Sequence, residues 1–447
     1  MSSQQCLVNA TDFVANRTYA KALHRERARI LLADAVTLAL AAGVVPGASD
    51  LFELGVGKGE HLAWFSGHRL GAADAVQANA AAVCARFQDD CEMSSWSHPG
   101  SFVVPAAVAA GIETGASYGQ VIDGLIAGYA FTVWLGGGGL VARAMMETGR
   151  RPSPNFGVAG ACAAASRAAR LSPEQTLHAV SGALLVGRGS LHSVGAGGED
   201  WRLHNPGAAR DGLLYALAAR AGMTSGPGAL DARNGYLRMF AGIEEIPEML
   251  KQPPRSEMIL EVWHKALPTL GDDMAVALAA RELSRQGYGD DPKRVTVRMN
   301  EHFAHFPGTQ NRPPYTSLTS ALSSVRFVTA QLLINGTLDF DDYARRDDPI
   351  VTALADRIEV VPDSSLGYVD AVVTVDTGDG EQTCRTSDLP RTLFFRDSDE
   401  QRRVAGELLG DAGVAVVETL LTGGEDTPAD EVLHKALHTF HPVSTAP

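Results

Sequence analysis

The residues best suited to chemistry lie in one short segment, Asp-Asp-Cys-Glu-Met-Ser-Ser-Trp-Ser-His-Pro-Gly at 89–100. Asp89 and Asp90 are adjacent carboxylates, and His98 belongs to the residue type that exchanges protons near neutral pH. A Pro-Gly pair follows His98 and opens an Ala-rich apolar run, as is common at the first turn of a helix. We therefore expect His98 on a loop just before a helix, with Asp89 or Asp90 orienting its ring and fixing its tautomer.

Basic side chains occur in two further polar segments. Arg202 and His204 lie in Trp-Arg-Leu-His-Asn-Pro-Gly-Ala-Ala, and Lys265 lies in Trp-His-Lys-Ala-Leu-Pro at an apparent domain boundary. Ligands often bind at domain boundaries, so such a cluster is a candidate site for an anionic ligand. The plainer alternatives are an arginine that satisfies a helix end and a lysine that lies on the surface.

Composition limits the partners of this 447-residue chain. Its 38 basic and 52 acidic residues give a formal net charge of −14, which argues against nucleic acid or an anionic membrane as a partner. The five cysteines are odd in number and form no C-x-x-C motif, which favours free thiols in a reducing cytoplasm. No signal peptide is apparent, and no uninterrupted apolar run is long enough to predict a membrane span.

Other motifs give weaker signals. The glycine run 136–139 lacks the Lys and Ser/Thr of a phosphate loop, so it predicts a turn between helices. The Gly-rich segment 193–198 follows no strand, which argues against a dinucleotide site. His302 and His305 have H-x-x-H spacing but no evident third ligand, so we expect no metal site. No G-x-S-x-G motif indicates a hydrolase nucleophile.

Hydrophobic periodicity predicts a mainly α fold of two domains. Residues 1–266 and 396–447 read as one large all-helical domain, in which abundant Ala and Gly indicate close helix packing. Residues 267–395 read as a smaller α+β domain with strands near 295–299, 357–361, 371–375 and 382–385. Thr-Gly-Asp-Gly at 377–380 is a strong hairpin signal between the last two strands.

Taken together, these segments resemble the MmgE/PrpD family, which includes 2-methylcitrate dehydratase, cis-aconitate decarboxylase and iminodisuccinate epimerase. The resemblance rests on the paired Asp and His-Pro of 89–99, on Leu-His-x-x-Gly-Ala-Ala at 203–209, on Lys265 with Pro268, and on Ala-Leu-Ser-Ser at 321–324. It covers nearly the whole chain. It implies a helical domain made from both chain ends, an inserted α+β domain, a cleft at their junction, a homodimer, and small di- or tricarboxylate substrates.

The chain departs from the family pattern at two positions. Where dehydratases and the decarboxylase carry Gly-aromatic-His-Pro-Thr, this chain has Gly-Arg-Arg-Pro-Ser, so Arg151 replaces the histidine. Arg202 replaces the lysine of the Leu-His segment. Arginine stays protonated and binds carboxylates through a bidentate fork, so two proton-transfer positions become substrate-binding positions, with His204 beside them.

These departures favour an epimerase or racemase that needs no cofactor. One group removes the proton next to a substrate carboxylate and another returns it, and His98 and Lys265 suit these roles. Arg151 and Arg202 would stabilise the enediolate-like charge. Two alternatives stay open: a lyase, either a 2-methylcitrate-type dehydratase or a cis-aconitate-type decarboxylase, and a non-catalytic dicarboxylate-binding protein.

Overall fold

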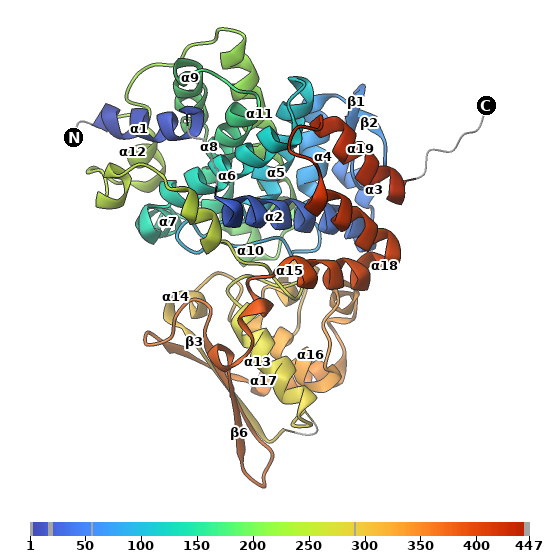
Figure 1. The fold of residues 1–447 in the computed structure, drawn as a ribbon. Helices are drawn as coiled ribbons and strands as arrows, with labels where there is room; N and C mark the ends of the chain where they lie inside the picture. The colour runs from blue at the N-terminus through green and yellow to red at the C-terminus, as the bar shows by residue number, and fades with distance from the viewer. Residues whose placement is uncertain (1–2, 17–20, 55–56, 290–291, 442–447) are drawn as a thin grey trace. The chain divides into compact units, whose positions relative to one another are not determined.

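The computed structural model describes residues 3–16, 21–54, 57–289 and 292–441, which are mainly α-helical (Figure 1). Backbone contacts divide the chain into two compact units. We call Met1–Ser190, Arg202–Trp263 and Arg396–Pro447 the helical unit, and Leu191–Trp201 with His264–Phe395 the α+β unit.

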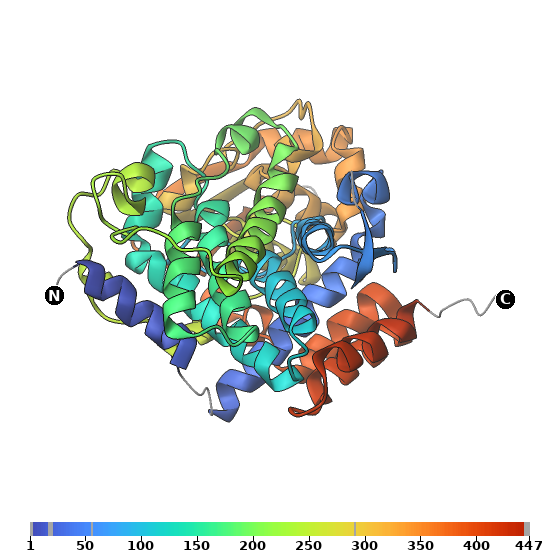
Figure 2. The same cartoon turned by 90° about the horizontal axis from the view of Figure 1, so that it is seen from above.

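The helical unit contains most of the helices and one short hairpin (Figure 2). Its helices are α1 (Ser3–Asn16), α2 (Ala22–Leu40), α3 (Ala48–Phe52), α4 (Ala72–Cys84), α5 (Gly100–Glu113), α6 (Tyr118–Leu135), α7 (Leu140–Glu147), α8 (Pro152–Ala168), α9 (Pro173–Leu184), α11 (His204–Arg220), α12 (Tyr236–Ala241), α18 (Ser398–Thr422) and α19 (Ala429–Phe440). The hairpin pairs β1 (Lys58–Leu62) with β2 (Arg69–Leu70).

Small residues let the central helices of this unit approach closely. Helix α8 packs against α5, α6 and α11, and its side chains are buried along almost its whole length. A Cβ atom added at Gly160 of α8 would lie 2.2 Å from the Thr132 hydroxyl of α6, and one added at Gly212 of α11 would lie 2.5 Å from Ala161. The Ala- and Gly-rich composition is therefore a packing requirement of this core.

Both ends of the chain meet in the helical unit through a buried ion pair. Arg396, just before α18, donates to Asp34 of α2 over 2.5 Å, and both side chains are at most 3 % exposed. Arg27, two turns before Asp34 on the same face of α2, donates to the backbone carbonyls of Arg396 and Val262. Charged side chains can be buried in this core because Arg396 pairs with Asp34 and Arg27 donates to backbone carbonyls.

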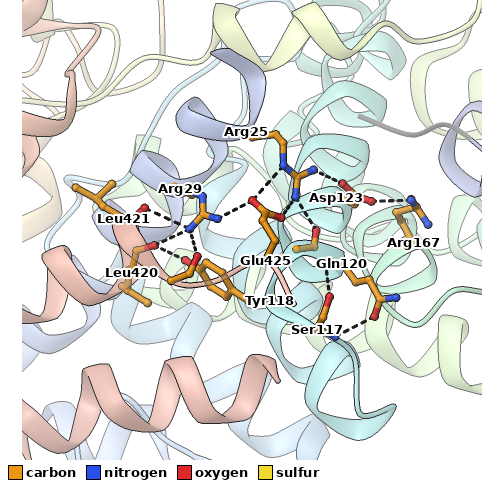
Figure 3. A network of polar contacts seen from close by, with 12 residues as sticks. Arg25, Arg29, Ser117, Tyr118, Gln120, Asp123, Arg167, Leu420, Leu421 and Glu425 are labelled. Carbon is orange, nitrogen blue, oxygen red and sulfur yellow. Dashed lines mark hydrogen bonds and ion pairs between the residues drawn. The ribbon is translucent and has the colours of Figure 1, made fainter. Parts of the chain in front are cut away.

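A second network joins the segment after α18 to α2 and α6 (Figure 3). Glu425 accepts hydrogen bonds from Arg25 and, over 2.6 Å, from Arg29. Arg25 also reaches Asp123 of α6 over 2.5 Å, and Arg167 of α8 completes the network at 2.7 Å from the same carboxylate. The helical unit thus depends on segments nearly 400 residues apart in sequence.

The α+β unit is built on a four-stranded mixed sheet with strand order β4-β3-β5-β6. The strands are β3 (Arg294–Asn300), β4 (Glu359–Asp363), β5 (Ala371–Asp376) and β6 (Glu381–Arg385). The helices are α10 (His192–Ala196), α13 (Met274–Arg285), α14 (Glu301–Ala304), α15 (Leu318–Leu322), α16 (Val325–Asn335) and α17 (Pro349–Arg357). Only the β3–β4 pair is parallel, and β5 alternates buried with half-buried residues where α13 packs on it.

The expected domain boundaries differ from these units in two places. Residues 191–201, expected in the helical domain, belong to the α+β unit because α10 packs on α15 and the Trp201 indole N–H donates to Thr319 over 3.2 Å. The boundary expected at 266 lies after Trp263, because the backbone N–H of His264 pairs with the carbonyl of Phe394.

One stretch of the described chain, Tyr118–Glu147, is long and apolar enough to cross a membrane by length and composition. Within it, 89 % of the apolar window is buried, as expected of a core helix. The glycines at 137–139 adopt positive φ values and form the turn between α6 and α7 that the sequence predicts.

The buried ion pair should be essential for stability. We expect Asp34→Asn to lower the free energy of unfolding by about 3–5 kcal/mol, because Arg396 would keep a buried, uncompensated charge. Asp399→Asn is the matched control: Asp399 also pairs with an arginine, but its side chain is 95 % exposed, so we expect a loss below about 1 kcal/mol. Urea denaturation followed by circular dichroism measures both, and equal losses would contradict this ranking.

Candidate active site

His98 lies on a tight loop directly before α5, as the sequence predicts. The loop is closed by pairing between Glu92 and Ser97, and Cys91 pairs with Trp263. The Glu92 carboxylate accepts from the backbone N–H groups of Ser94 (2.6 Å) and Ser95 (2.8 Å) inside the loop. These bonds hold the loop in one conformation and make Glu92 a structural rather than a reactive carboxylate.

The imidazole of His98 is oriented by a backbone carbonyl. Its Nδ1 atom lies 2.9 Å from the carbonyl oxygen of Asp90 and 3.3 Å from the thiol of Cys91. A carbonyl only accepts hydrogen bonds, so this contact places the proton of the neutral ring on Nδ1 and the lone pair on Nε2. The residue expected to orient His98 is therefore Asp90, but it acts through its main chain.

The carboxylate of Asp90 has a different role, which is to fix the start of α5. It accepts from the backbone N–H of Gly100 and from the hydroxyl of Tyr129, both over 2.7 Å. Burial raises the pKa of Asp90 to about 7, although these two donors oppose the shift. A Cβ atom at Gly100 would lie 2.9 Å from this carboxylate, so glycine is required for the contact.

Two serines and an asparagine hold the backbone of His98. The N–H of His98 donates to the Ser153 hydroxyl over 3.1 Å, and the carbonyl of His98 accepts from the Ser101 hydroxyl over 2.7 Å. The side-chain amide of Asn205 donates to both hydroxyls, at 2.8 Å to Ser101 and 3.0 Å to Ser153. We call these three residues the serine–asparagine clamp. Sequence reasoning missed them, although Ser153 and Asn205 lie in segments that it singled out.

Arg151, Arg202 and Asp89 gather near the thiol of Cys84 and are all buried. Burial and Asp89 raise the pKa of Cys84, to about 12, while the two arginines oppose the shift, so all four groups lie within electrostatic range. Nη1 of Arg202 donates to the carbonyl of Ala85 over 2.8 Å, and Ala85 directly follows the last residue of α4. The helical unit thus brings both expected carboxylate-binding arginines to one region.

His204 begins α11 and is partly buried. Gly189 approaches its ring so closely that an added Cβ atom would lie 3.0 Å from Nδ1. The next residue along the chain is Asn205 of the clamp. His204 therefore precedes a residue that holds the backbone of His98.

Lys265 lies in the α+β unit and is fully buried. Its Nζ donates to the carbonyl of Thr269 over 3.2 Å. Two acidic residues follow in the same segment. Burial raises the pKa of Asp272 to about 7, with the charge of Lys265 opposing, and raises the pKa of Asp273 above its usual range. Lys265 thus lies within electrostatic range of the Asp272 carboxyl group.

Among the residues that the structure describes, no group of three or more His, Cys, Asp or Glu side chains could hold a metal ion. His302 and His305, the pair with H-x-x-H spacing, are exposed at the short helix α14 and its end.

The amino-acid sequence matches one protein family along most of its length. Residues 9–249 match the MmgE/PrpD N-terminal domain and residues 273–391 match the MmgE/PrpD C-terminal domain. The chain is 26 % identical over 340 residues, 70 % of each protein, to the cis-aconitate decarboxylase-like protein oryM of Aspergillus oryzae. It is 28 % identical over 224 residues to the cis-aconitate decarboxylase of Aspergillus terreus, a match that spans 48 % of this chain and 45 % of that enzyme. With both family domains matched in order, the chain belongs to the MmgE/PrpD family.

Proposed function

We propose that this protein is a cofactor-independent epimerase or racemase that acts at the carbon next to a carboxylate in a small di- or polycarboxylate. The observation that carries the proposal is the orientation of His98, whose Nδ1 is tied to a carbonyl so that Nε2 is the basic nitrogen of the neutral ring. The buried pair Arg151 and Arg202 supports binding of an anionic substrate.

The reaction would begin when Nε2 of His98 removes the proton next to a carboxylate. The electron pair of the broken C–H bond moves into the carboxylate and forms an enediolate-like species with added negative charge. Arg151 and Arg202 would bind this charge through fixed N–H donors, which is where electrostatic catalysis contributes most. Lys265, the second proton-transfer candidate, would then protonate the carbon to give the opposite configuration.

The arginine at position 151 supports epimerisation over elimination. A dehydratase must protonate a departing hydroxyl group, and the family histidine suited to that step is Arg151 here. An arginine does not give up its proton near neutral pH. Returning the proton to carbon needs no leaving group, so the residues present suffice for an epimerase.

A lyase is the second candidate, and the names of the relatives favour it. The two relatives described above are a cis-aconitate decarboxylase and a protein like it. A decarboxylase would bind a tricarboxylate with the same arginines and replace a C–C bond by a C–H bond, so His98 or Lys265 would protonate carbon after carbon dioxide has left.

Isotope exchange separates these functions. We expect incubation in D₂O with single stereoisomers of iminodisuccinate, aspartate derivatives or 2-methylcitrate to introduce deuterium at the α-carbon of a substrate and to remove its optical activity, without an alkene signal in the NMR spectrum. Alkene formation from 2-methylcitrate, or release of carbon dioxide from cis-aconitate, would contradict the epimerase and establish a lyase. Binding without exchange or turnover would indicate a binding protein.

Substitution of the proton-transfer residues should abolish turnover but not binding. We expect His98→Gln and Lys265→Met each to lower kcat by at least about 100-fold, as is typical when a general acid or base is removed. Arg202→Gln should instead raise KM strongly, because it removes a carboxylate ligand. Steady-state kinetics with isothermal titration calorimetry of the same variants distinguishes the two effects, and His302→Gln on exposed α14 is the control.

The serine–asparagine clamp should act on kcat through the position of His98. We expect Asn205→Ala and Ser153→Ala to lower kcat by about 10- to 100-fold with little change in KM, since small displacements of a catalytic group are costly. The pH profile should keep its shape, because Ser153 and Ser101 bond the backbone N–H and carbonyl of His98. Ser181→Ala, at a buried serine of α9, is the matched control. A change confined to thermal stability would show that the clamp only supports the fold.

A further inference from the structure

A cavity in the helical unit is lined by residues of α19 and of the β1–β2 hairpin; Figure 1 labels these elements. Its volume is about 440 Å³, which falls in the range typical of small-molecule sites. Leu62, Ala63 and Leu437 supply its apolar surface. Its polar residues are Ser66, His68, Arg69, His434, His438 and His441.

The polar residues that line this cavity are mostly histidines. Four histidines and one arginine face it, and no carboxylate is among the residues that line it. This contrasts with the chain as a whole, in which acidic residues outnumber basic ones by 52 to 38. Because an arginine and four histidines line this cavity and no carboxylate does, its lining favours an anion.

The structure positions several of these rings. Nε2 of His441 donates to the carbonyl oxygen of Trp64 over 2.8 Å. A Cβ atom added at Gly67 would lie 3.3 Å from the His441 ring, so the turn packs closely on the residue that directly follows α19. The rings of His434 and His438 lie one turn apart on α19, with centroids 6.1 Å apart.

Acidic groups also lie close to this cavity. Glu53 accepts from Nδ1 of His68 over 2.7 Å and from the hydroxyl of Ser66. Glu60 lies 3.6 Å from Arg69, and Asp430 lines a smaller neighbouring cavity that His434 also borders. None of these three carboxylates is among the residues that line the cavity itself.

We propose that this cavity binds a small anion that carries carboxylate or phosphate groups. Donors come from two walls, with His68 and Arg69 on the hairpin and His434 and His438 on α19, so a compound with two anionic groups fits better than a single ion. A metal site is disfavoured because the described histidines form no group of three that could hold one. The proposal does not depend on the reaction assigned to His98.

Titration of the histidine rings tests the proposal directly. Protein labelled with ¹⁵N-histidine is titrated with citrate or inorganic phosphate, with sodium chloride at equal ionic strength as the control. His434→Gln and His438→Gln assign the two ring signals. We expect saturable shifts at both rings with citrate, with phosphate or with both, which identifies the anionic group that is recognised. Shifts that match those in chloride, or a response confined to His98, would overturn the proposal.

Calorimetry of variants provides the second measurement. We expect the double variant H434Q/H438Q to bind the responding anion at least about tenfold more weakly, as is usual when charge-assisted hydrogen bonds are lost. His305→Gln, at an exposed histidine of the α+β unit, should bind with unchanged affinity. If the double variant does not fold, Arg69→Gln replaces it. Unchanged affinity in a folded cavity variant would overturn the proposal.

Discussion

The candidate site depends on one residue that makes two kinds of contact. Asp90 uses its carboxylate to hold the first N–H of α5 and the hydroxyl of Tyr129, and uses its carbonyl to fix the proton on Nδ1 of His98. Because both contacts belong to the same residue, the start of α5 and the tautomer of His98 are set together. The Asp90 carboxyl group is buried in this arrangement, and burial raises its pKa to about 7.

Buried arginines have different partners in two parts of the helical unit. Near the chain ends, arginines and carboxylates are paired with one another, as in Asp34 with Arg396. Near Cys84, Arg202 donates to the backbone carbonyl of Ala85, which fixes the position of its guanidinium. A guanidinium with a fixed position suits the bidentate geometry in which arginine binds a carboxylate.

Local patterns predicted much of the fold. The strands of the α+β unit, its hairpin turn and the loop before α5 all follow from residue types a few positions apart. Short strands such as β1 and β2 were missed, because β2 has only two residues and the register of the pair is interrupted.

The same local patterns could not predict long-range contacts. The grouping of 191–201 with the α+β unit depends on Trp201 meeting Thr319, and the clamp depends on Asn205 meeting Ser101 across more than 100 residues. The role of Asp90 was half predicted, since the residue was identified but the orienting atom is its carbonyl and not its carboxylate. Assigning an atom requires the folded backbone, which residue types alone do not supply.

The ion pair between Asp34 and Arg396 also has a consequence for synthesis on the ribosome. The partners are 362 positions apart, and the whole of 264–395 is made between them. Until residue 396 emerges, α2 exposes a surface that contains an unpaired acid and the apolar residues that α18 later covers. The nascent chain must therefore carry an incomplete core through nearly its whole translation, which makes this surface the natural place for a chaperone to bind.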